Sequence, residues 1–280
     1  MKKIIYLLMI VFSVSLTAQS NVRVEEFVIN GSLKKSDPVS AGLGRINAIK
    51  LNLKVGDRLY SKLTADFVPL LVLVPPSGVY KITYPDEKTF AATYNGIIDE
   101  PGQWLIYIVG DSTATGNYTL LNKYASVGSM NFNNSLDYCD RVNLLLSHEK
   151  AHFFFLKGKE IDDSGIWESK INLENDVAAE IYGNKNEYFK TTIFKSSNYK
   201  LSKSEFTYTA DNIAKCLGSG WTKRENDWHN VLGNDNVSQK IILFAEKSKD
   251  KRYVKIILSK NKKTKEAADY TISLIISDLR

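Results

Sequence analysis

One stretch of the sequence, residues 135–156, has a helical pattern, and the sequence on both sides of it has the patterns of β-strands. Its apolar residues fall within a stripe about 100° wide, which predicts a helix with one buried face. These residues are Tyr138, Val142, Leu145, Leu146, Phe153 and Leu156. Ser135 is expected to cap the N-terminus of this helix, and Gly158 to stop it. The chain is therefore expected to place a helix between two β-rich regions.

The first residues have the pattern of a secretory signal. Lys2 and Lys3 precede an apolar run at 4–16, and small residues follow at 17–20. The run of about thirteen residues is too short to cross a bilayer comfortably. We expect a signal peptide at residues 1–18, cut after Ala18 or Ser20, and an exported protein that is periplasmic or extracellular. No later run reaches about eighteen apolar residues, so no transmembrane segment is expected after cleavage.

Length and charge limit the remaining classes. A chain of 280 residues with 44% hydrophobic residues can form two domains or one large one, which excludes disorder. The net charge of +6 falls to about +4 once the two signal lysines are removed (6 − 2). This charge is weak for a nucleic-acid binder, so no nucleic-acid partner is expected. The most basic stretch, residues 247–265, is interpreted as a solvated hairpin, with an anionic polymer or membrane surface as the alternative.

The N-terminal region contains many short strand patterns and no helix. They lie at residues 22–29, 46–53, 59–63, 70–74, 90–94, 104–109 and 118–121. This spacing predicts an antiparallel β-sandwich domain at residues 19–126. Asn30-Gly31 is expected to form a turn, and the runs 46–53 and 59–63 a hairpin.

Several of these segments resemble a known family. They are 47–53 with Val55-Gly56, 70–74 with Pro75 to Gly78, 101–110 and 116–120. Together, over residues 46–121, they resemble the bacterial pre-peptidase C-terminal domain, a small β-sandwich appended to secreted enzymes. Only Asp66 is acidic where the family often has an acidic pair, so the implied calcium site lacks the carboxylates that Ca²⁺ needs. Tyr80, Tyr84 and Tyr94 are interpreted either as a sugar-binding platform or as cross-strand packing.

The C-terminal region mixes helices and strands. A Gly/Asn-rich linker at 128–134 and the helix at 135–156 are followed by three strand patterns, a helix at 205–217 ending at Gly218, and four strand patterns. The strand patterns lie at 167–173, 178–182, 188–194, 221–225, 240–245, 253–258 and 270–276. This order predicts an α+β domain at residues 127–280, with two helices on one face of an antiparallel sheet.

A second resemblance covers nearly all of residues 136–277. It is carried by 153–158, 167–170, 215–218 before Trp221, and 270–274. These segments resemble a family of uncharacterised secreted proteins from Bacteroidetes-type bacteria, whose fold is similar to type III secretion chaperones. The resemblance implies a fold and no activity.

One motif carries metal chemistry. His148-Glu149-Lys150-Ala151-His152 matches H-E-x-x-H, which on a helix places two imidazoles on one face to share Zn²⁺, with Glu149 as general base. The extended form of the motif is not completed, because Phe155 and Gly158 occupy its glycine and third histidine positions. Remote candidates for a third ligand are Glu174, Glu180 and His229. The alternative is two surface histidines beside an apolar stripe.

The chain has two cysteines, Cys139 and Cys216. In an oxidising compartment they either form a disulfide or remain two buried thiols.

The sequence favours an exported, non-catalytic binding protein that uses no cofactor. Its ligand, a protein, peptide or cell-envelope component, is expected to contact an open sheet edge or the groove between helix and sheet. The alternative is a zinc-dependent hydrolase that uses His148, His152 and Glu149. A third hypothesis is carbohydrate adhesion through the sandwich.

Overall fold

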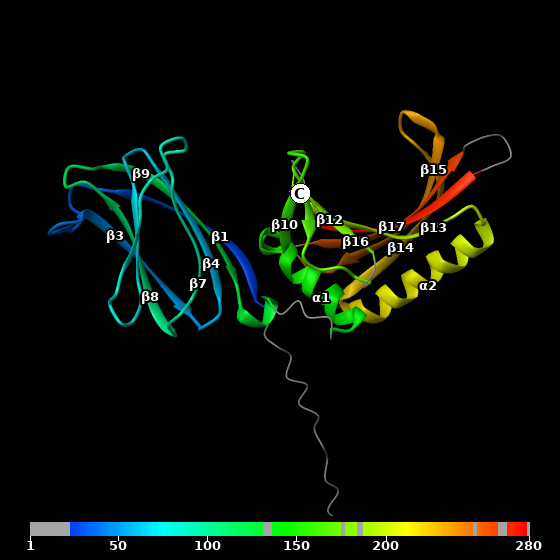
Figure 1. Ribbon diagram of the computed structural model, residues 1–280, viewed down its shortest axis with the longest axis horizontal. Helices are drawn as coiled ribbons and strands as arrows, with labels where there is room; N and C mark the ends of the chain where they lie inside the picture. The colour runs from blue at the N-terminus through cyan, green and yellow to red at the C-terminus, as the bar shows by residue number, and fades with distance from the viewer. Residues whose placement is uncertain are drawn as a thin grey trace, which may run out of the picture.

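The computed structural model describes residues 23–130, 136–174, 177–183, 187–248, 251–262 and 268–278. The predicted signal peptide and the predicted cap Ser135 lie outside these residues. Within the described residues, nine strands come first along the chain, followed by an α-helix, four strands, a second α-helix and four more strands. Figure 1 shows their arrangement. The predicted antiparallel strands and two helices are confirmed, whereas the division into two domains stays a prediction.

The N-terminal strands form two facing sheets with a shared core, here called the sandwich unit (residues 24–125). One sheet has the order β1-β9-β4-β7 and the other β2-β3-β8-β5-β6. The strands are β1 (Val24–Leu33), β2 (Val39–Ser40), β3 (Gly44–Leu53), β4 (Arg58–Ala65), β5 (Leu70–Val74), β6 (Lys81–Thr83), β7 (Ala92–Ile97), β8 (Gly102–Gly110) and β9 (Gly116–Ala125). Alternate residues of both sheets, among them Leu63, Leu71 and Trp104, are fully buried between them.

The predicted hairpin of β3 and β4 was wrong. β3 pairs with β8, whereas β4 pairs with β9 and β7 in the opposite sheet. The chain crosses between the sheets at Gly56, whose φ is +86°, and at the fully buried Asp57. Side-chain alternation is the same whichever sheet a strand joins, so the pattern could not distinguish the two arrangements.

The predicted turn at Asn30-Gly31 was also wrong, because both residues lie inside β1 opposite Thr119 and Tyr118. A Cβ atom at Gly31 would lie 2.4 Å from the Tyr118 ring. Gly31 therefore leaves space for the Tyr118 ring and does not form a turn.

The C-terminal strands form one eight-stranded antiparallel sheet of order β10-β11-β12-β13-β17-β16-β15-β14. The strands are β10 (Lys157–Ile161), β11 (Ile166–Ser169), β12 (Ala179–Tyr182), β13 (Tyr188–Ser196), β14 (Trp221–Val231), β15 (Asn234–Glu246), β16 (Arg252–Lys262) and β17 (Ala268–Asp278). Helices α1 (Tyr138–Glu149) and α2 (Tyr199–Leu217) lie together on one face of this sheet (Figure 1). Residues 138–278 are here called the helix–sheet unit. β10 was missed, because it follows directly on the stretch assigned to the first helix.

Both helices differ in length from their predictions. α1 begins after Asp137, whose side chain accepts a hydrogen bond from the Asp140 N–H, and ends at Glu149. α2 begins six residues earlier than predicted, after Asn198, and ends as predicted before Gly218. No helix of the described residues is long and apolar enough to cross a membrane.

A disulfide joins Cys139 of α1 to Cys216 of α2, with their Cα atoms 4.8 Å apart. It fastens the start of one helix to the end of the other, above the core of the helix–sheet unit.

Candidate functional site

The first histidine of the H-E-x-x-H motif is buried at the end of α1. His148 is fully inaccessible, and its Nε2 donates a hydrogen bond to the Ser129 carbonyl oxygen at 2.8 Å. Ser129 belongs to a short 3₁₀ helix, Val127–Met130, that follows β9. Burial lowers the pKa of His148 to about 4, and repulsion from Lys170 acts in the same direction. This imidazole is therefore neutral at physiological pH and serves to hold α1 against the chain that leaves β9.

The second histidine does not share a helical face with the first. α1 ends at Glu149, and His152 has a φ of +52°, so the assumption of a helix through the whole motif was wrong. The His152 Nε2 lies 3.5 Å from Oε1 of Glu26 on β1, while Glu149 is only 6% exposed. Within the described ranges, no group of three or more His, Cys, Asp or Glu side chains is placed to hold a metal ion.

The three remote ligand candidates lie in different surroundings. The Glu180 carboxylate on β12 accepts a hydrogen bond from the Tyr182 hydroxyl, and His229 lies on the exposed strand β14. Burial, with repulsion from Glu205, raises the pKa of Glu174. Among the described residues, none of the three completes a metal-binding group with the motif.

The residues after α1 instead form a junction with the sandwich unit. Ala151 and Phe155 are buried in one small cluster with Val24 of β1 and Ala125 of β9. The Phe154 ring lies 4.6 Å from the ring of Tyr60 on β4, measured between centroids. We call this set, residues 151–155 with their partners on β1, β4 and β9, the junction.

An ion-pair network adds to the junction. The Glu26 carboxylate lies 2.9 Å from the Lys123 Nζ and also faces His152. Burial by itself raises the pKa of Glu26, but hydrogen bonds from His152 and Lys123 outweigh it and lower the pKa to about 2. Lys123 also lies 5.2 Å from the centroid of the Phe154 ring.

A second polar contact fixes the chain as it leaves the sandwich unit. The buried Asp57 carboxylate accepts hydrogen bonds from the Tyr124 hydroxyl at 2.5 Å and from the Val127 N–H at 3.1 Å. Burial, together with this donation to Asp57, raises the pKa of Tyr124 above its usual range. The turn after β3 and the exit from β9 are thus held by one carboxylate.

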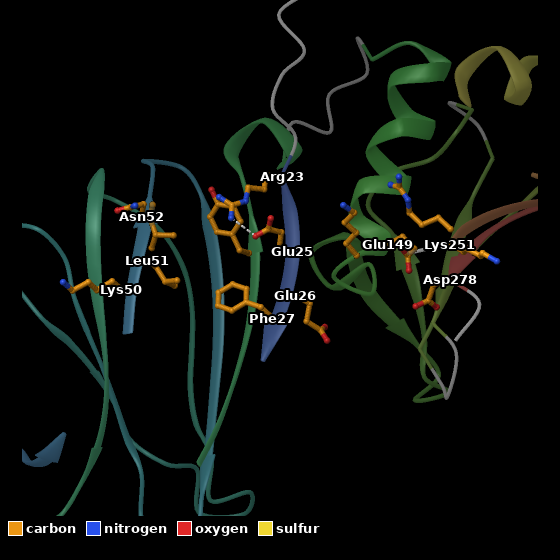
Figure 2. Close-up of a pocket in the computed structure, with 14 residues that line it drawn as sticks. Arg23, Glu25, Glu26, Phe27, Lys50, Leu51, Asn52, Glu149, Lys251 and Asp278 are labelled. Carbon is orange, nitrogen blue, oxygen red and sulfur yellow. Dashed lines mark hydrogen bonds and ion pairs between the residues drawn. The ribbon is translucent and has the colours of Figure 1, made fainter. Parts of the chain in front are cut away.

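A cleft of about 850 Å³ opens beside the junction. The sandwich side contributes Arg23 just before β1, residues 25–27 of β1, residues 50–53 of β3, and Tyr124. The helix–sheet unit contributes Glu149 and Lys150 at the end of α1, residues 251–252 at the start of β16, and Asp278 at the end of β17. Figure 2 shows the β1 residues in the middle of the cleft, between the β3 residues and Glu149.

Some charged side chains of the cleft form ion pairs with other described residues, and some do not. Glu25 pairs with Arg23 at 2.8 Å, and the Arg252 guanidinium pairs with Glu246 outside the cleft. Lys150 and Lys251 are exposed, and neither forms an ion pair with the described residues. The wall of the helix–sheet unit also carries the carboxylates of Glu149 and Asp278 (Figure 2). Lys150 and Lys251 are its exposed cations, and they are the groups on this wall that suit an acidic ligand.

One edge of the helix–sheet unit and the aromatic residues singled out in the sequence are less suited to binding. The edge strand β14 has irregular pairing with β15 at two places and a row of exposed charged side chains, features that block strand pairing. Tyr80 and Tyr84 are 59% and 68% exposed, but Tyr94 is half-buried against the sandwich core. Tyr94 is therefore less available to a sugar than the other two tyrosines. The cleft was missed, because no local pattern connects β1, β3 and the end of α1.

Comparisons with known proteins give only weak likenesses. No protein-family model and no curated protein matches the chain. One similar solved structure is the pre-peptidase C-terminal domain of a collagenase from Bacillus anthracis, at 16% identity and a TM-score of 0.27, covering 35% of this chain and 89% of that one. Another is PliG from Aeromonas hydrophila, a periplasmic inhibitor of g-type lysozyme, at 11% identity and a TM-score of 0.27, covering 38% and 89%. Likenesses of this strength carry no argument about this chain, and both resemblances stated from the sequence stay predictions.

Proposed function

We propose that this chain is an exported, non-catalytic binding protein whose partner occupies the cleft beside the junction. In this proposal residues 1–18 are a signal peptide, 19–126 a β-sandwich domain and 127–280 an α+β domain. Separate hydrophobic cores in the two units, joined by the small cluster at the junction, support the division.

The observation that carries the proposal is that both units build the cleft. Its volume of about 850 Å³ lies within the usual range of ligand sites. A partner in this cleft contacts β1, β3 and the end of α1 together, so its affinity depends on both units. The disulfide between α1 and α2 supports a role in an oxidising compartment, where export would place the protein.

The surroundings of the motif histidines favour binding over zinc-dependent hydrolysis. A catalytic zinc needs several converging ligands and an open position for water. The imidazole of His148 is instead buried against Ser129, and His152 faces Glu26. Carbohydrate adhesion through the tyrosines has less support, since Tyr94 packs against the core.

Site-specific photo-crosslinking in the producing cell tests the proposal. A photoreactive amino acid at Lys150 probes the cleft, and one at Lys203, on the exposed face of α2, is the matched control. We expect a discrete adduct from position 150 that is absent from position 203 and that is lost when Glu replaces Lys251. Equal adducts from both positions, or none from position 150, would contradict a partner in the cleft.

A further inference from the structure

β1 is an edge strand, and the direction of its main-chain groups follows from its pairing. The Ser126 N–H donates to the Arg23 carbonyl, so the main-chain groups of Arg23 face β9. In an antiparallel pair these groups alternate between the two sides of a strand. The register with β9 continues from Val24 to Leu33 without a shift, so Glu25 and Phe27 also face β9. Glu26 and Val28 therefore present their N–H and C=O groups on the opposite edge.

The pairing of β9 supports the same alternation. The Asp66 N–H donates to the Asn117 carbonyl, so the odd-numbered residues of β9 face β4. Their even-numbered neighbours then face β1, as the bond from Ser126 requires.

The outer edge of β1 is open in the described part of the chain. There, β1 pairs with β9 alone, and no main-chain hydrogen bond reaches Glu26 or Val28 from the residues after α1. The edge is straight, unlike β14, whose irregular pairing blocks strand addition. Its first part, through Glu26 and Phe27, lies in the middle of the cleft (Figure 2), and Val28 follows directly beyond the lining.

Both sides of this edge suit the side chains of an added strand. On one side lie Phe27, Tyr124 and Leu51, which are apolar or aromatic. On the other lie the exposed Lys150 and Lys251 of the helix–sheet unit, together with the carboxylates of Glu149 and Asp278. A lysine on the edge strand itself would serve only to repel pairing, but these two lysines lie on the facing wall, where they suit acidic side chains of a ligand.

We propose that the cleft binds an extended, acidic segment of a partner protein as an added strand on the outer edge of β1. Main-chain hydrogen bonds to Glu26 and Val28 hold the segment, and its acidic side chains meet Lys150 and Lys251. This inference rests on the proposed function, because it names the kind of partner that the same cleft takes.

The test uses the full mature chain and a defined probe. The probe is a fluorescent ten-residue peptide of alternating Glu and Thr with blocked ends, titrated by fluorescence anisotropy. The first matched peptide carries N-methyl groups on alternate residues, which remove the main-chain donors of one edge and keep the charge. The second replaces Glu by Lys, and an alginate oligosaccharide with the same number of carboxylates serves as a non-peptide anion.

Two protein variants test separately whether binding depends on strand addition and on charge. Val28→Pro removes an outward N–H at a half-exposed edge position, where proline is tolerated, and Val28→Thr is its control. Lys150→Glu reverses the charge of one side chain on the facing wall. Thermal unfolding of each variant shows that it is folded, and the N-methylated peptide gives the same information without altering the protein.

We expect the acidic peptide to bind at least tenfold more tightly than the N-methylated, lysine and alginate probes. Val28→Pro and Lys150→Glu should each weaken binding at least tenfold, whereas Val28→Thr should not. Amide exchange at Glu26 and Val28 should slow when the peptide binds.

Other outcomes overturn strand addition in distinguishable ways. In one such outcome the acidic and N-methylated peptides bind equally well, and binding is weakened by Lys150→Glu but not by Val28→Pro. That result would keep the cleft as a binding site and reject strand addition. Equal binding of alginate would identify an anionic polymer as the ligand class. If the protein forms a dimer and the Val28→Pro variant does not, the outer edge of β1 binds a second copy of the chain. No binding of the acidic peptide would reject this inference, while the crosslink from position 150 would still test the proposed function.

Discussion

The imidazole of His152 lies 3.5 Å from the Glu26 carboxylate, although the two residues are on different units of the molecule. Lys123 holds the same carboxylate from β9 at 2.9 Å. A motif typical of zinc enzymes thus contributes here to the contact between a β-sandwich and a helix-covered sheet. Variants of its charged residues, its aromatic rings and its buried histidine measure how much each stabilises that contact.

Replacing Glu26 by Gln should lower the free energy of unfolding by about 1–2 kcal/mol at pH 7, after allowance for solvent screening. The folded pKa of Glu26, about 2, lies below its ordinary value of 4.5. Its stabilisation is therefore complete above about pH 4.5 and is lost as the pH falls toward 2. Urea unfolding at several pH values measures the difference. Glu25→Gln, at an exposed pair with Arg23, is the control and should change little. A deficit that persists unchanged at pH 2 would contradict the charge argument.

Phe154→Ala should uncouple the two units. The Phe154 ring contacts Tyr60, Phe155 and Lys123, and its partial burial sets the cost at about 2 kcal/mol. We expect calorimetry to show two unfolding transitions farther apart than in the unaltered chain. Phe90→Ala, at a residue 68% exposed on the sandwich, should leave the transitions in place. An identical shift in both variants would argue against a specific role for the junction.

His148 should make the protein less stable in mild acid. Because the folded pKa is about 4 and the ordinary value 6.5, the unfolded chain binds a proton between these pH values that the folded chain does not. Stability should fall by about 2–3 kcal/mol between pH 7 and pH 4.5 from this residue alone. His148→Gln keeps a donor for the Ser129 carbonyl but cannot titrate, so it should remove this part of the pH dependence. Parallel pH profiles of the two proteins would refute the prediction.

Loss of the disulfide should destabilise the helix–sheet unit. The bond between Cys139 and Cys216 closes a loop with a sequence separation of 77, for which chain entropy gives about 4.5 kcal/mol. The double variant Cys139→Ser/Cys216→Ser should show this loss in urea unfolding. A reducing agent should produce a similar loss in the unaltered protein and no further change in the variant. Equal stability with and without the bond would show that packing alone holds α1 to α2.

The two motif histidines should not retain zinc. Elemental analysis of the mature protein, purified without chelator or His tag, should find no stoichiometric metal that disappears in His148→Ala/His152→Ala. The physical reason is that one imidazole is buried against Ser129 and the other faces Glu26. About one zinc per chain, lost in the variant, would restore the hydrolase hypothesis.

Local sequence patterns were sufficient to predict most of the segments that form helices and strands, but not which strands pair with each other. Alternating residues placed most strands, and Gly218 ended α2 as predicted. The first helix was drawn too long because Phe153 and Leu156 continue its apolar stripe, although both are buried after the helix has ended. Their burial comes from tertiary packing, which periodicity does not report. The same reason explains the wrong pairing of β3 with β4.

The candidate site was less predictable than the fold. The sequence drew attention to His148, Glu149 and His152 through a motif, and the structure gives the first and last of them a role in packing. The cleft depends on the edge of β1 lying near Lys150 and Lys251, residues more than a hundred positions away. Such closeness is a property of the assembled units, and single-sequence patterns contain no signal for it.

The carboxylate of Asp57 has a consequence for the order in which the chain acquires its structure. It lies in the turn after β3 but accepts hydrogen bonds from Tyr124 and Val127, nearly seventy residues later. During synthesis or passage through a narrow pore, the early strands are available long before these donors. The buried acid then lacks two of its partners, which disfavours a closed sandwich. The N-terminal sandwich should therefore stay open until β9 and the 3₁₀ helix that follows it have emerged, so that it closes only just before the helix–sheet unit begins.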